Sequence, residues 1–426
     1  MGKVRIPIHG FVYFDEAERA VINSFYFQRL RNIKQLSFTS YVYPGATHSR
    51  FEHSIGVMEV ADLIFSSICS KQEYKKKVKS SLKSINFSIN DAKKILRLAA
   101  LMHDTGHLPF SHGAEGILPN GKKHEDISCA VIKSQNIELT SLYSSEIVNA
   151  VLQIISNQPI IPELKLLRNI ISGSIDADRT DYLIRDSHHC GVDYGIFDSK
   201  RLIESMTVVE GHIDGLELSV DASGVHALES LIMARYYMFT QVYFHKTRRI
   251  YDYYLRQYMT KWEQKFKENI LDVLNEDDIT IWQSLRHDSL KNTESGEFAK
   301  RIVNRNNHSV LLDSSAFADK VEISKFEKVY KYMLNKYDTL DFWVDNFSGK
   351  IHELFSDGDD DGEELKITKG SEGYLLTEYS QVLKKLPKKF TKVRIYVSEK
   401  KCTKKLDSKL LLKLQNEALK IERNSN

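Results

Sequence analysis

Two adjacent polar residues, His103 and Asp104, follow an apolar stretch whose residues recur at helical spacing up to Met102. Polar groups at the end of a buried helix cost free energy unless they bind something. Polar side chains interrupt two other helical stretches, at His53 and at Asp178. Two imidazoles and two carboxylates suit Mn, Fe, Co, Ni, Zn or Mg, and four protein ligands leave octahedral positions open for water or substrate. A buried histidine with a capping aspartate is the structural alternative, and these residues alone leave both interpretations open.

The composition is that of a globular protein: of 426 residues, 42% are apolar and 27% charged, and 60 Lys+Arg against 57 Asp+Glu leave a formal charge of +3. A chain of this length buries roughly three quarters of its unfolded surface and needs no metal or disulfide to complete its core. The four cysteines are far apart and form no C-x-x-C pair, which suits a reducing cytosol. No apolar run approaches the ~18 residues of a membrane span, and the first residues carry no signal peptide. We therefore expect a cytoplasmic protein with no membrane contact.

Helical periodicity dominates the first 270 residues, so we expect a mainly α fold. Helices are expected over residues 51–70, 91–104, 124–135, 143–156, 165–190 and 224–268. The main strand signal in this part is a hairpin over residues 207–220. Past residue 270, polar helices precede strand-like runs at 373–376 and 393–397. We predict two domains: 1–270 with the functional site, and 271–426 as a smaller α+β lobe for oligomerisation or allosteric control.

Two charged segments have weaker functional interpretations. Asp357–Gly362 imitates the first half of a calcium-binding EF-hand loop, but position twelve is Thr368 rather than glutamate, which favours a solvated acidic loop. Residues 384–405 hold ten Lys/Arg and a single acid, interleaved with Phe390 and Tyr396. Such a run is usually a solvated face, and nucleic-acid contact is the weaker interpretation.

Several ordered motifs resemble one known family, the HD-domain phosphohydrolases, in their branch of deoxynucleoside triphosphate triphosphohydrolases. The motifs keep their order and spacing over most of the first 255 residues: Pro7–Gly10, Gln28–Leu36, Tyr43–Ser54, His103–His112 and Asp178–His189. The resemblance implies an HD-domain helical core with a small β-hairpin. It also identifies the ligands of one divalent metal ion as His53, His103, Asp104 and Asp178.

The resemblance further implies a catalytic relay beside the metal, formed by His107, Glu115 and His124. A water that attacks phosphorus must lose a proton, and the departing oxygen gains from receiving one. His112 is a second candidate for protonating the leaving oxygen, and the sequence does not divide this role between His107 and His112. Glu115 stands where relatives have aspartate, which keeps the charge on a longer side chain. The alternative for these histidines is structural hydrogen bonding around a turn.

A triphosphate needs cations and hydrogen-bond donors, and the resemblance supplies them. Relatives use the corresponding positions for phosphates, for the 3′-hydroxyl and for excluding a 2′-hydroxyl; here they are Gln35, Leu36, Arg50, Arg179, Tyr182, Asp186, Arg235, Tyr243 and Lys246. Gln28 and Arg31 match an activating-nucleotide site. The sequence departs from the vertebrate enzyme of this family at two positions. Phe239 stands where that enzyme has a histidine, and Asn23 stands where it has the aspartate that binds guanine. An amide cannot accept both guanine N–H donors, which argues against GTP and leaves the identity of an activating nucleotide open.

These features predict a metal-dependent dNTP triphosphohydrolase, in which a metal-bound hydroxide attacks the α-phosphorus and releases deoxynucleoside and tripolyphosphate. A second enzyme interpretation is an HD-type phosphatase or phosphodiesterase acting on nucleoside monophosphates, alarmones or cyclic dinucleotides, although no Gly-Tyr-Pro motif follows the His-Asp pair. A third is a nucleotide sensor or nucleic-acid-binding protein without essential catalysis. By resemblance we also expect a homo-oligomer, either a dimer or a tetramer, with antiviral defence as one role open to it.

Overall fold

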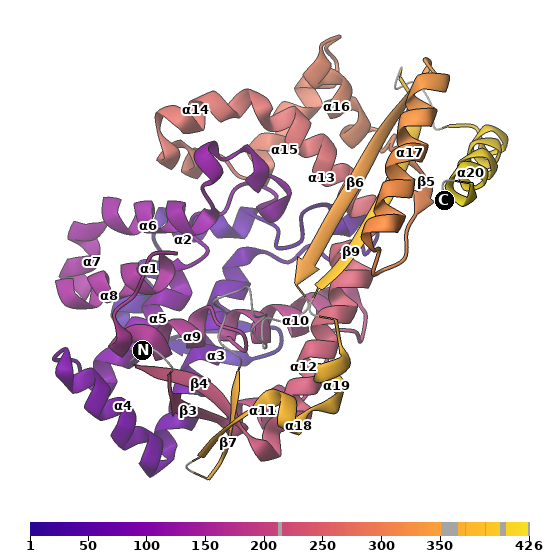
Figure 1. The fold of residues 1–426 in the computed structure, drawn as a ribbon. Coiled ribbons are helices and arrows are strands. Elements are labelled where there is room, and N and C mark those ends of the chain that lie inside the picture. The colour runs from indigo at the N-terminus through magenta and orange to yellow at the C-terminus, as the bar shows by residue number, and fades with distance from the viewer. Residues whose placement is uncertain (212–214, 351–364, 371, 388, 401–405, 425–426) are drawn as a thin grey trace. The chain divides into compact units, whose positions relative to one another are not determined.

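The computed structural model describes residues 1–211, 215–350, 365–370, 372–387, 389–400 and 406–424. The chain forms two compact units. Figure 1 shows its helices and strands, coloured along the chain. Unit 1 comprises Met1–Met238, Trp262–Asp278 and His352–Leu386, and unit 2 comprises Phe239–Lys261, Ile279–Ile351 and Pro387–Asn426. These units interleave along the chain, whereas the predicted domains 1–270 and 271–426 are continuous. The functional division at residue 270 stays a prediction.

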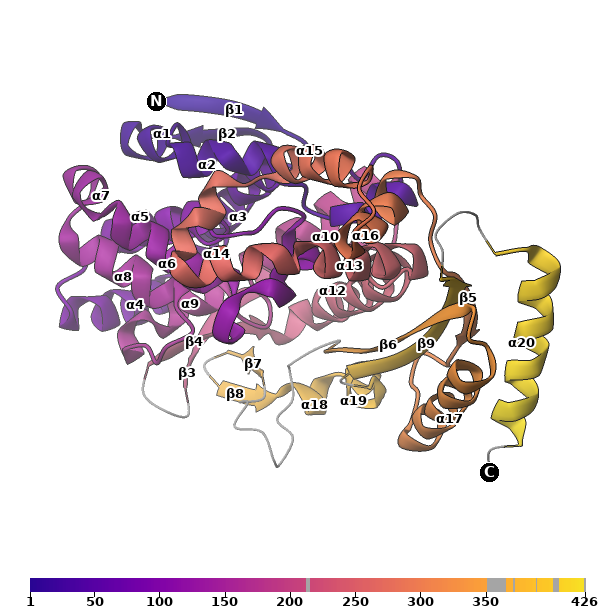
Figure 2. The ribbon, with the colours of Figure 1, turned by 90° about the horizontal axis from the view of Figure 1, so that it is seen from above.

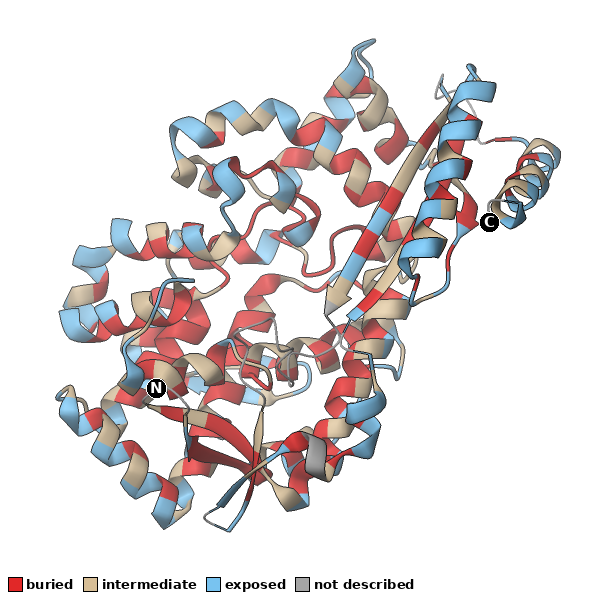
Figure 3. Cartoon of the chain, viewed as in Figure 1, coloured by how far each residue is buried: buried red, intermediate tan, exposed pale blue. Residues whose placement is uncertain are grey.

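A bundle of helices around α3 (Arg50–Ser70) forms the core of unit 1. Apolar side chains occur on several sides of α3, and most of its length is buried (Figure 3), because neighbouring helices cover it. It packs against α5 (Ile89–Met102), α9 (Lys165–Ile171) and α10 (Ala177–Cys190), and α5 also contacts α8 (Ser145–Ile155). The predicted mainly α fold is confirmed.

Two of the expected helices are divided in the structure. Residues 165–190 form α9 and α10, and the second helix restarts where Asp176 accepts a hydrogen bond from the backbone N–H of Arg179. Residues 224–268 form α12 (Val225–Met238), the π-helix η8 (Phe239–Tyr243), α13 (Lys246–Met259) and α14 (Glu263–Glu268). Periodicity does not predict these breaks, because the apolar residues on both flanks keep the helical spacing.

The structure describes further helices in both units, and one of them begins at the predicted relay residue His124. In unit 1 they are α1 (Glu16–Ile22), α2 (Phe25–Arg29), α4 (Gln72–Ser84), α6 (His124–Ser134), α7 (Asn136–Leu142), α11 (Ser199–Ser205), α18 (Leu376–Tyr379) and α19 (Gln381–Lys385). α15 (Asp278–Asp288) starts at the last residue of a unit 1 segment, and α16 (Glu294–Val303) lies in unit 2. Among the described residues no helix is long and apolar enough to cross a membrane.

Unit 1 also holds two small sheets. The predicted hairpin is present as antiparallel β3 (Met206–Glu210) and β4 (Leu216–Asp221). β4 pairs in parallel with β7 (Lys366–Lys369), and β7 pairs with β8 (Glu372–Leu375), giving the order β3-β4-β7-β8. A second antiparallel hairpin pairs β1 (Gly2–Ile6) with β2 (Gly10–Phe14).

Unit 2 contains an antiparallel sheet in the order β5-β9-β6, formed by β5 (Ser309–Asp313), β9 (Lys389–Glu399) and β6 (Leu340–Lys350). Figure 2 shows α17 (Lys320–Lys336) and α20 (Ser408–Arg423) beside this sheet, and apolar residues of both helices share one core with it. The α+β character predicted for the C-terminal part is therefore present.

The structure weakens the nucleic-acid interpretation of the basic segment. Phe390 and Tyr396 are each only 1% exposed, so within the described residues they are core side chains of β9 and cannot stack on bases. Arg394 is buried and donates to Asp313. The EF-hand-like Asp357–Gly362 lies outside the described residues.

Candidate metal centre and substrate cavity

Three helices of unit 1 bring the predicted metal ligands together. His53 and Asp178 lie in the first turns of α3 and α10, and His103 caps the C-terminus of α5, directly before Asp104. His53 Nε2 lies 3.0 Å from Asp178 Oδ1 and 3.6 Å from Asp104 Oδ2. His103 Nε2 lies 3.3 Å from Asp104 Oδ1 and 4.0 Å from Asp178 Oδ1. Octahedral ligands at about 2.1 Å from an ion lie about 3 to 4 Å from one another, so these separations fit one divalent ion.

Hydrogen bonds orient both histidines for metal binding. His103 Nδ1 lies 2.7 Å from the carbonyl oxygen of Ala100, and His53 Nδ1 lies 2.8 Å from Asp181 Oδ2. Each Nδ1–H can therefore donate, which leaves Nε2 as a lone-pair donor to a metal. His103 Nε2 is buried and has no hydrogen-bond partner within the described part of the chain. A buried polar atom of this kind is expected where a ligand binds.

The electrostatic field of the four side chains favours a cation. Burial raises the pKa of Asp104 and Asp178, but Arg50 beside the first and His53 beside the second outweigh it and hold both pKa values below the ordinary range. Burial lowers the pKa of His53, but the carboxylates of Asp178 and Asp181 outweigh it and raise the pKa to about 10. The same negative field would attract a divalent ion.

The predicted relay residues form a connected group next to Asp104. Glu115 Oε1 accepts a hydrogen bond from His124 Nδ1 at 2.5 Å, and Oε2 accepts one from His112 Nδ1 at 2.8 Å. The ring of His107 stacks on that of His124 with centroids 3.8 Å apart, and His107 Nε2 lies 3.3 Å from Asp104 Oδ1. Both ring nitrogens of His107 are buried without a hydrogen-bond partner among the described residues.

The members of this group differ in charge. Burial, Arg50 and His124 hold the pKa of His107 well below its ordinary value, so its ring is neutral. Burial opposes the charge on His124, but Glu115 outweighs it and raises the pKa of the ring. Despite burial, His112 and His124 hold the pKa of Glu115 far below its ordinary range. The ligand atoms of the four side chains also lie within 4.8 Å of one another, so the group could hold a second cation.

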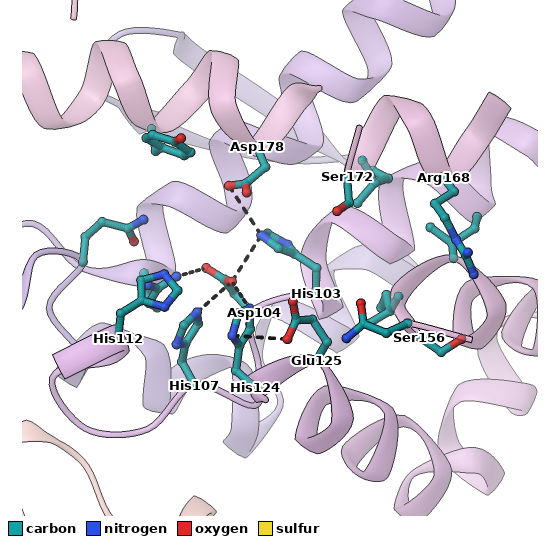
Figure 4. Close-up of a pocket in the computed structure, with 17 residues that line it drawn as sticks. His103, Asp104, His107, His112, His124, Glu125, Ser156, Arg168, Ser172 and Asp178 are labelled. Carbon is teal, nitrogen blue, oxygen red and sulfur yellow. Dashed lines mark hydrogen bonds and ion pairs between the residues drawn. The ribbon is translucent and has the colours of Figure 1, made fainter. Parts of the chain in front are cut away.

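A cavity of about 330 Å³ opens beside the predicted metal ligands, the metal group of His53, His103, Asp104 and Asp178 (Figure 4). Of the predicted site residues it is lined by Gln35, Arg50, His103, Asp104, His107, His112, His124, Asp178 and Tyr182. Figure 4 shows His112, His107 and His124 on one side of Asp104, with Ser156, Arg168 and Ser172 on the other. The sequence did not indicate this second side, whose residues belong to α8, to α9 and to the segments that follow them and carry no motif.

Arg50 and Gln35 contribute polar groups to the cavity wall. Arg50 is 2% exposed, and its guanidinium donates to Asp104 Oδ2 at 2.5 Å and to the hydroxyl of Ser111 at 2.7 Å. It therefore supplies positive charge immediately beside the metal ligands. Gln35 is also buried, and its Oε1 has no hydrogen-bond partner in the described segments. Burial raises the pKa of Tyr182 to about 12, so its hydroxyl stays protonated as a donor.

Other predicted substrate residues do not line this cavity. Leu36 is a buried core residue, Arg179 pairs with Asp176 at 3.0 Å, and Asp186 lies 2.7 Å from His48 Nε2. Arg235 lies in α12, close enough to Tyr182 to influence its hydroxyl. Tyr243 and Lys246 belong to unit 2, so their substrate roles stay predictions.

The predicted activator residues and the two departures lie as follows. The side chain of Arg31 donates to Gln28 Oε1 at 2.8 Å and covers the ring of Phe51. Asn23 ends α1, and Phe239 starts η8 in unit 2. Gln28 and Arg31 thus contact each other, and their role toward a nucleotide stays a prediction.

The sequence missed several residues that hold the site in place. Asp181 and Arg185 form a buried pair behind His53, and their spacing with Asp178 on one helix face was the available signal. His48 behind Asp186 lay inside a recognised motif but received no role. Arg29 donates to the carbonyl oxygen of His107 and to two carbonyls of residues 273–276, a long-range contact that no motif indicates.

Comparison with known proteins identifies the class. Family models of the HD domain and the HD associated region match residues 50–186 and 197–330. An uncharacterized protein of Methanocaldococcus jannaschii is 37% identical over 74% of this chain and 61% of its own length. A Dictyostelium discoideum homolog of a deoxynucleoside triphosphate triphosphohydrolase is 30% identical over 74% of this chain and 61% of its own length. A crystal structure of a hypothetical protein from Aquifex aeolicus matches with a TM-score of 0.77 and 32% identity over 98% of this chain and 99% of that one.

The chain belongs to the HD-domain phosphohydrolase family, which confirms the resemblance seen in its motifs. HD domains bind divalent metal ions, and this chain has His and Asp side chains that could hold one. The chain spans 61% of the length of the two curated relatives, so similarity establishes the family while the substrate is a matter for proposal.

Proposed function

We propose that this protein is a metal-dependent phosphohydrolase that cleaves dNTPs to deoxynucleoside and tripolyphosphate. The observation that carries the proposal is that three of the four predicted metal ligands, both relay histidines, His112 and the Arg50 guanidinium line one cavity. Each of these components accelerates the hydrolysis of a phosphate ester: a metal ion as Lewis acid, groups that transfer protons, and positive charge beside the phosphate. The similarity to the Dictyostelium triphosphohydrolase supports dNTPs as the substrate class.

The metal ion would supply Lewis acidity at the α-phosphorus and lower the pKa of the attacking water. Attack forms a new bond from the water oxygen to phosphorus and breaks the bond to the sugar O5′, so water loses a proton and O5′ gains one. We assign acceptance of the water proton to His107, because its ring is neutral and its Nε2 lies 3.3 Å from the predicted metal ligand Asp104. His112 is 54% exposed and is oriented by Glu115, so we assign to it the donation of a proton to O5′.

Other residues would bind the substrate. Arg50 is anchored by Asp104 and Ser111 and provides positive charge at the α-phosphate without rearrangement. The buried Oε1 of Gln35 could accept a hydrogen bond from a sugar hydroxyl, because it has no partner among the described residues. These assignments agree with the roles that the family resemblance implies for both residues.

The test is a substrate panel with purified protein and Mn²⁺ or Mg²⁺. Each dNTP, all four dNTPs together and the matching NTPs are compared with nucleoside monophosphates and cyclic dinucleotides. We expect tripolyphosphate and deoxynucleoside from dNTPs, and none from a His103→Ala/Asp104→Ala variant whose fold is verified by circular dichroism. Activity only in the mixture would indicate an activating nucleotide. Hydrolysis of monophosphates or cyclic dinucleotides alone would contradict the proposal.

A further inference from the structure

The motif Pro7–Gly10 has no role in the proposed reaction, yet it adopts an unusual backbone. It forms the turn between β1 and β2, and the N–H of His9 donates to the carbonyl oxygen of Pro7 at 3.0 Å. The residue between them, Ile8, has φ of 76°. This hydrogen bond around a positive φ defines a strained γ-turn, which a β-branched residue rarely adopts. Such strain persists only where surrounding contacts over-determine the conformation.

The contact that holds the turn leads to the metal centre. His9 Nε2 lies 2.6 Å from Asp181 Oδ1, and the other oxygen of Asp181 lies 2.8 Å from Nδ1 of the predicted ligand His53. Asp181 is therefore a carboxylate that accepts hydrogen bonds from a turn on one side and from the ligand on the other.

The surrounding sequence makes room for this chain of contacts. Arg185 donates to both oxygens of Asp181 at 2.8 Å, and the whole pair is inaccessible to solvent. Gly56 lies one turn after His53, and a Cβ at Gly56 would lie 2.0 Å from Asp181 Oδ1 and 2.4 Å from the Arg185 guanidinium. Only glycine leaves space there, so the helix that carries the ligand is shaped around Asp181.

We propose that His9 is a positioning residue for the metal centre: through Asp181 it fixes the orientation of His53 and makes the N-terminal hairpin a structural part of the site. Arg185 donates to both oxygens of Asp181 and fixes the plane of the carboxylate, and His9 adds a third contact that holds Oδ1 in place beside the oxygen that receives His53. Partners of this kind set the ring orientation of metal-bound histidines, and their loss typically costs 10- to 100-fold in metal affinity. The inference rests on the proposed metal site and not on the identity of the substrate.

The test compares metal retention in three variants loaded with Mn²⁺ or Co²⁺. His9→Leu keeps the size of the side chain but removes the donor, whereas His9→Gln can still donate an N–H to Asp181. Val12→Ala is the matched control, because Val12 is a fully buried residue of the same hairpin that takes no part in the chain of hydrogen bonds. Metal content is followed by mass spectrometry during exposure to EDTA, and thermal unfolding of each metal-free variant is measured in parallel.

We expect His9→Leu to lose metal about 10-fold faster than the wild type, with His9→Gln close to the wild type. Val12→Ala should unfold at a lower temperature while retaining metal normally. The proposal would be overturned if His9→Leu lost metal no faster than the wild type. It would also be overturned if Val12→Ala or His9→Gln lost metal as fast as His9→Leu. A wild-type protein that binds no metal would also overturn it. If the variants lose or retain metal as expected but the wild-type protein hydrolyses no dNTP, only the proposed substrate is contradicted.

Discussion

At the scale of single residues, the proposed role of each relay residue depends on whether its side chain is charged or neutral. Glu115 stays ionised because two histidines donate to it, and His107 stays neutral because burial and the neighbouring cations oppose protonation. A neutral ring beside an ionised carboxylate network can take a proton from water, which a cationic ring cannot. Asp104 joins this relay to the metal group, since His107 and His103 each lie 3.3 Å from its Oδ1.

Replacing Glu115 tests whether this network transfers protons. We expect Glu115→Gln to lower kcat about 100-fold or more, the usual contribution of a general acid or base, because His112 and His124 lose the carboxylate that orients them. The ion bound by His53, His103, Asp104 and Asp178 should be retained, since Glu115 is not one of these four predicted ligands. Steady-state kinetics and metal analysis of the same preparation check this, with the exposed Glu146→Gln as control. Unchanged kcat, or loss of metal along with activity, would contradict the relay.

At the scale of elements, a distant segment supports the loops that carry the site. Asp278 accepts hydrogen bonds from the backbone N–H of Phe110 at 2.6 Å and of Lys34 at 3.0 Å. These loops precede His112 and Gln35, and Phe110 and Ser111 both have positive φ. The motifs predict which residues gather at the site, but the support by residues 273–278 joins positions more than 150 residues apart and leaves no local signal.

Because the carboxyl group of Asp278 is buried, we also expect the stability of the folded chain to depend on pH. Burial raises the pKa of Asp278 from 3.8 to about 6. Between these values the folded chain keeps a proton that the unfolded chain releases, so the contribution of Asp278 to stability falls as pH rises through this window, by roughly 3 kcal/mol in total. Asp278→Asn should be less stable than the wild type at pH 4, because one backbone N–H loses its acceptor. That difference should shrink toward pH 7. Thermal unfolding between pH 4 and 7 measures it, and a constant difference would contradict a raised pKa.

At the scale of the whole molecule, the HD motifs allow the site to be predicted from the sequence. Features that depend on packing between distant segments could not be predicted. His53, His103, Asp104 and Asp178 are brought together, as their motifs predict. Interleaving of the two units is not predictable, because it depends on contacts between segments that lie far apart in the sequence. The pairing of β4 with β7 is equally hidden, because the strands are about 150 residues apart.

The assembly of the molecule remains a prediction from family resemblance. We expect a homo-oligomer, either a dimer or a tetramer, and the measurement is multi-angle light scattering with and without dNTPs. The protomer has a mass of 49.2 kDa. A single species of that mass under both conditions would contradict the prediction, and a shift to larger species with dNTPs would indicate a nucleotide site that promotes assembly.

In the proposed reaction, water attacks the α-phosphorus of a dNTP at the metal centre. The most direct measurement is hydrolysis in ¹⁸O-labelled water, followed by mass spectrometry of both products. We expect one ¹⁸O atom in tripolyphosphate and none in the deoxynucleoside, because the bond from phosphorus to O5′ breaks. Deoxynucleoside monophosphate with pyrophosphate, or ¹⁸O in the deoxynucleoside, would contradict it.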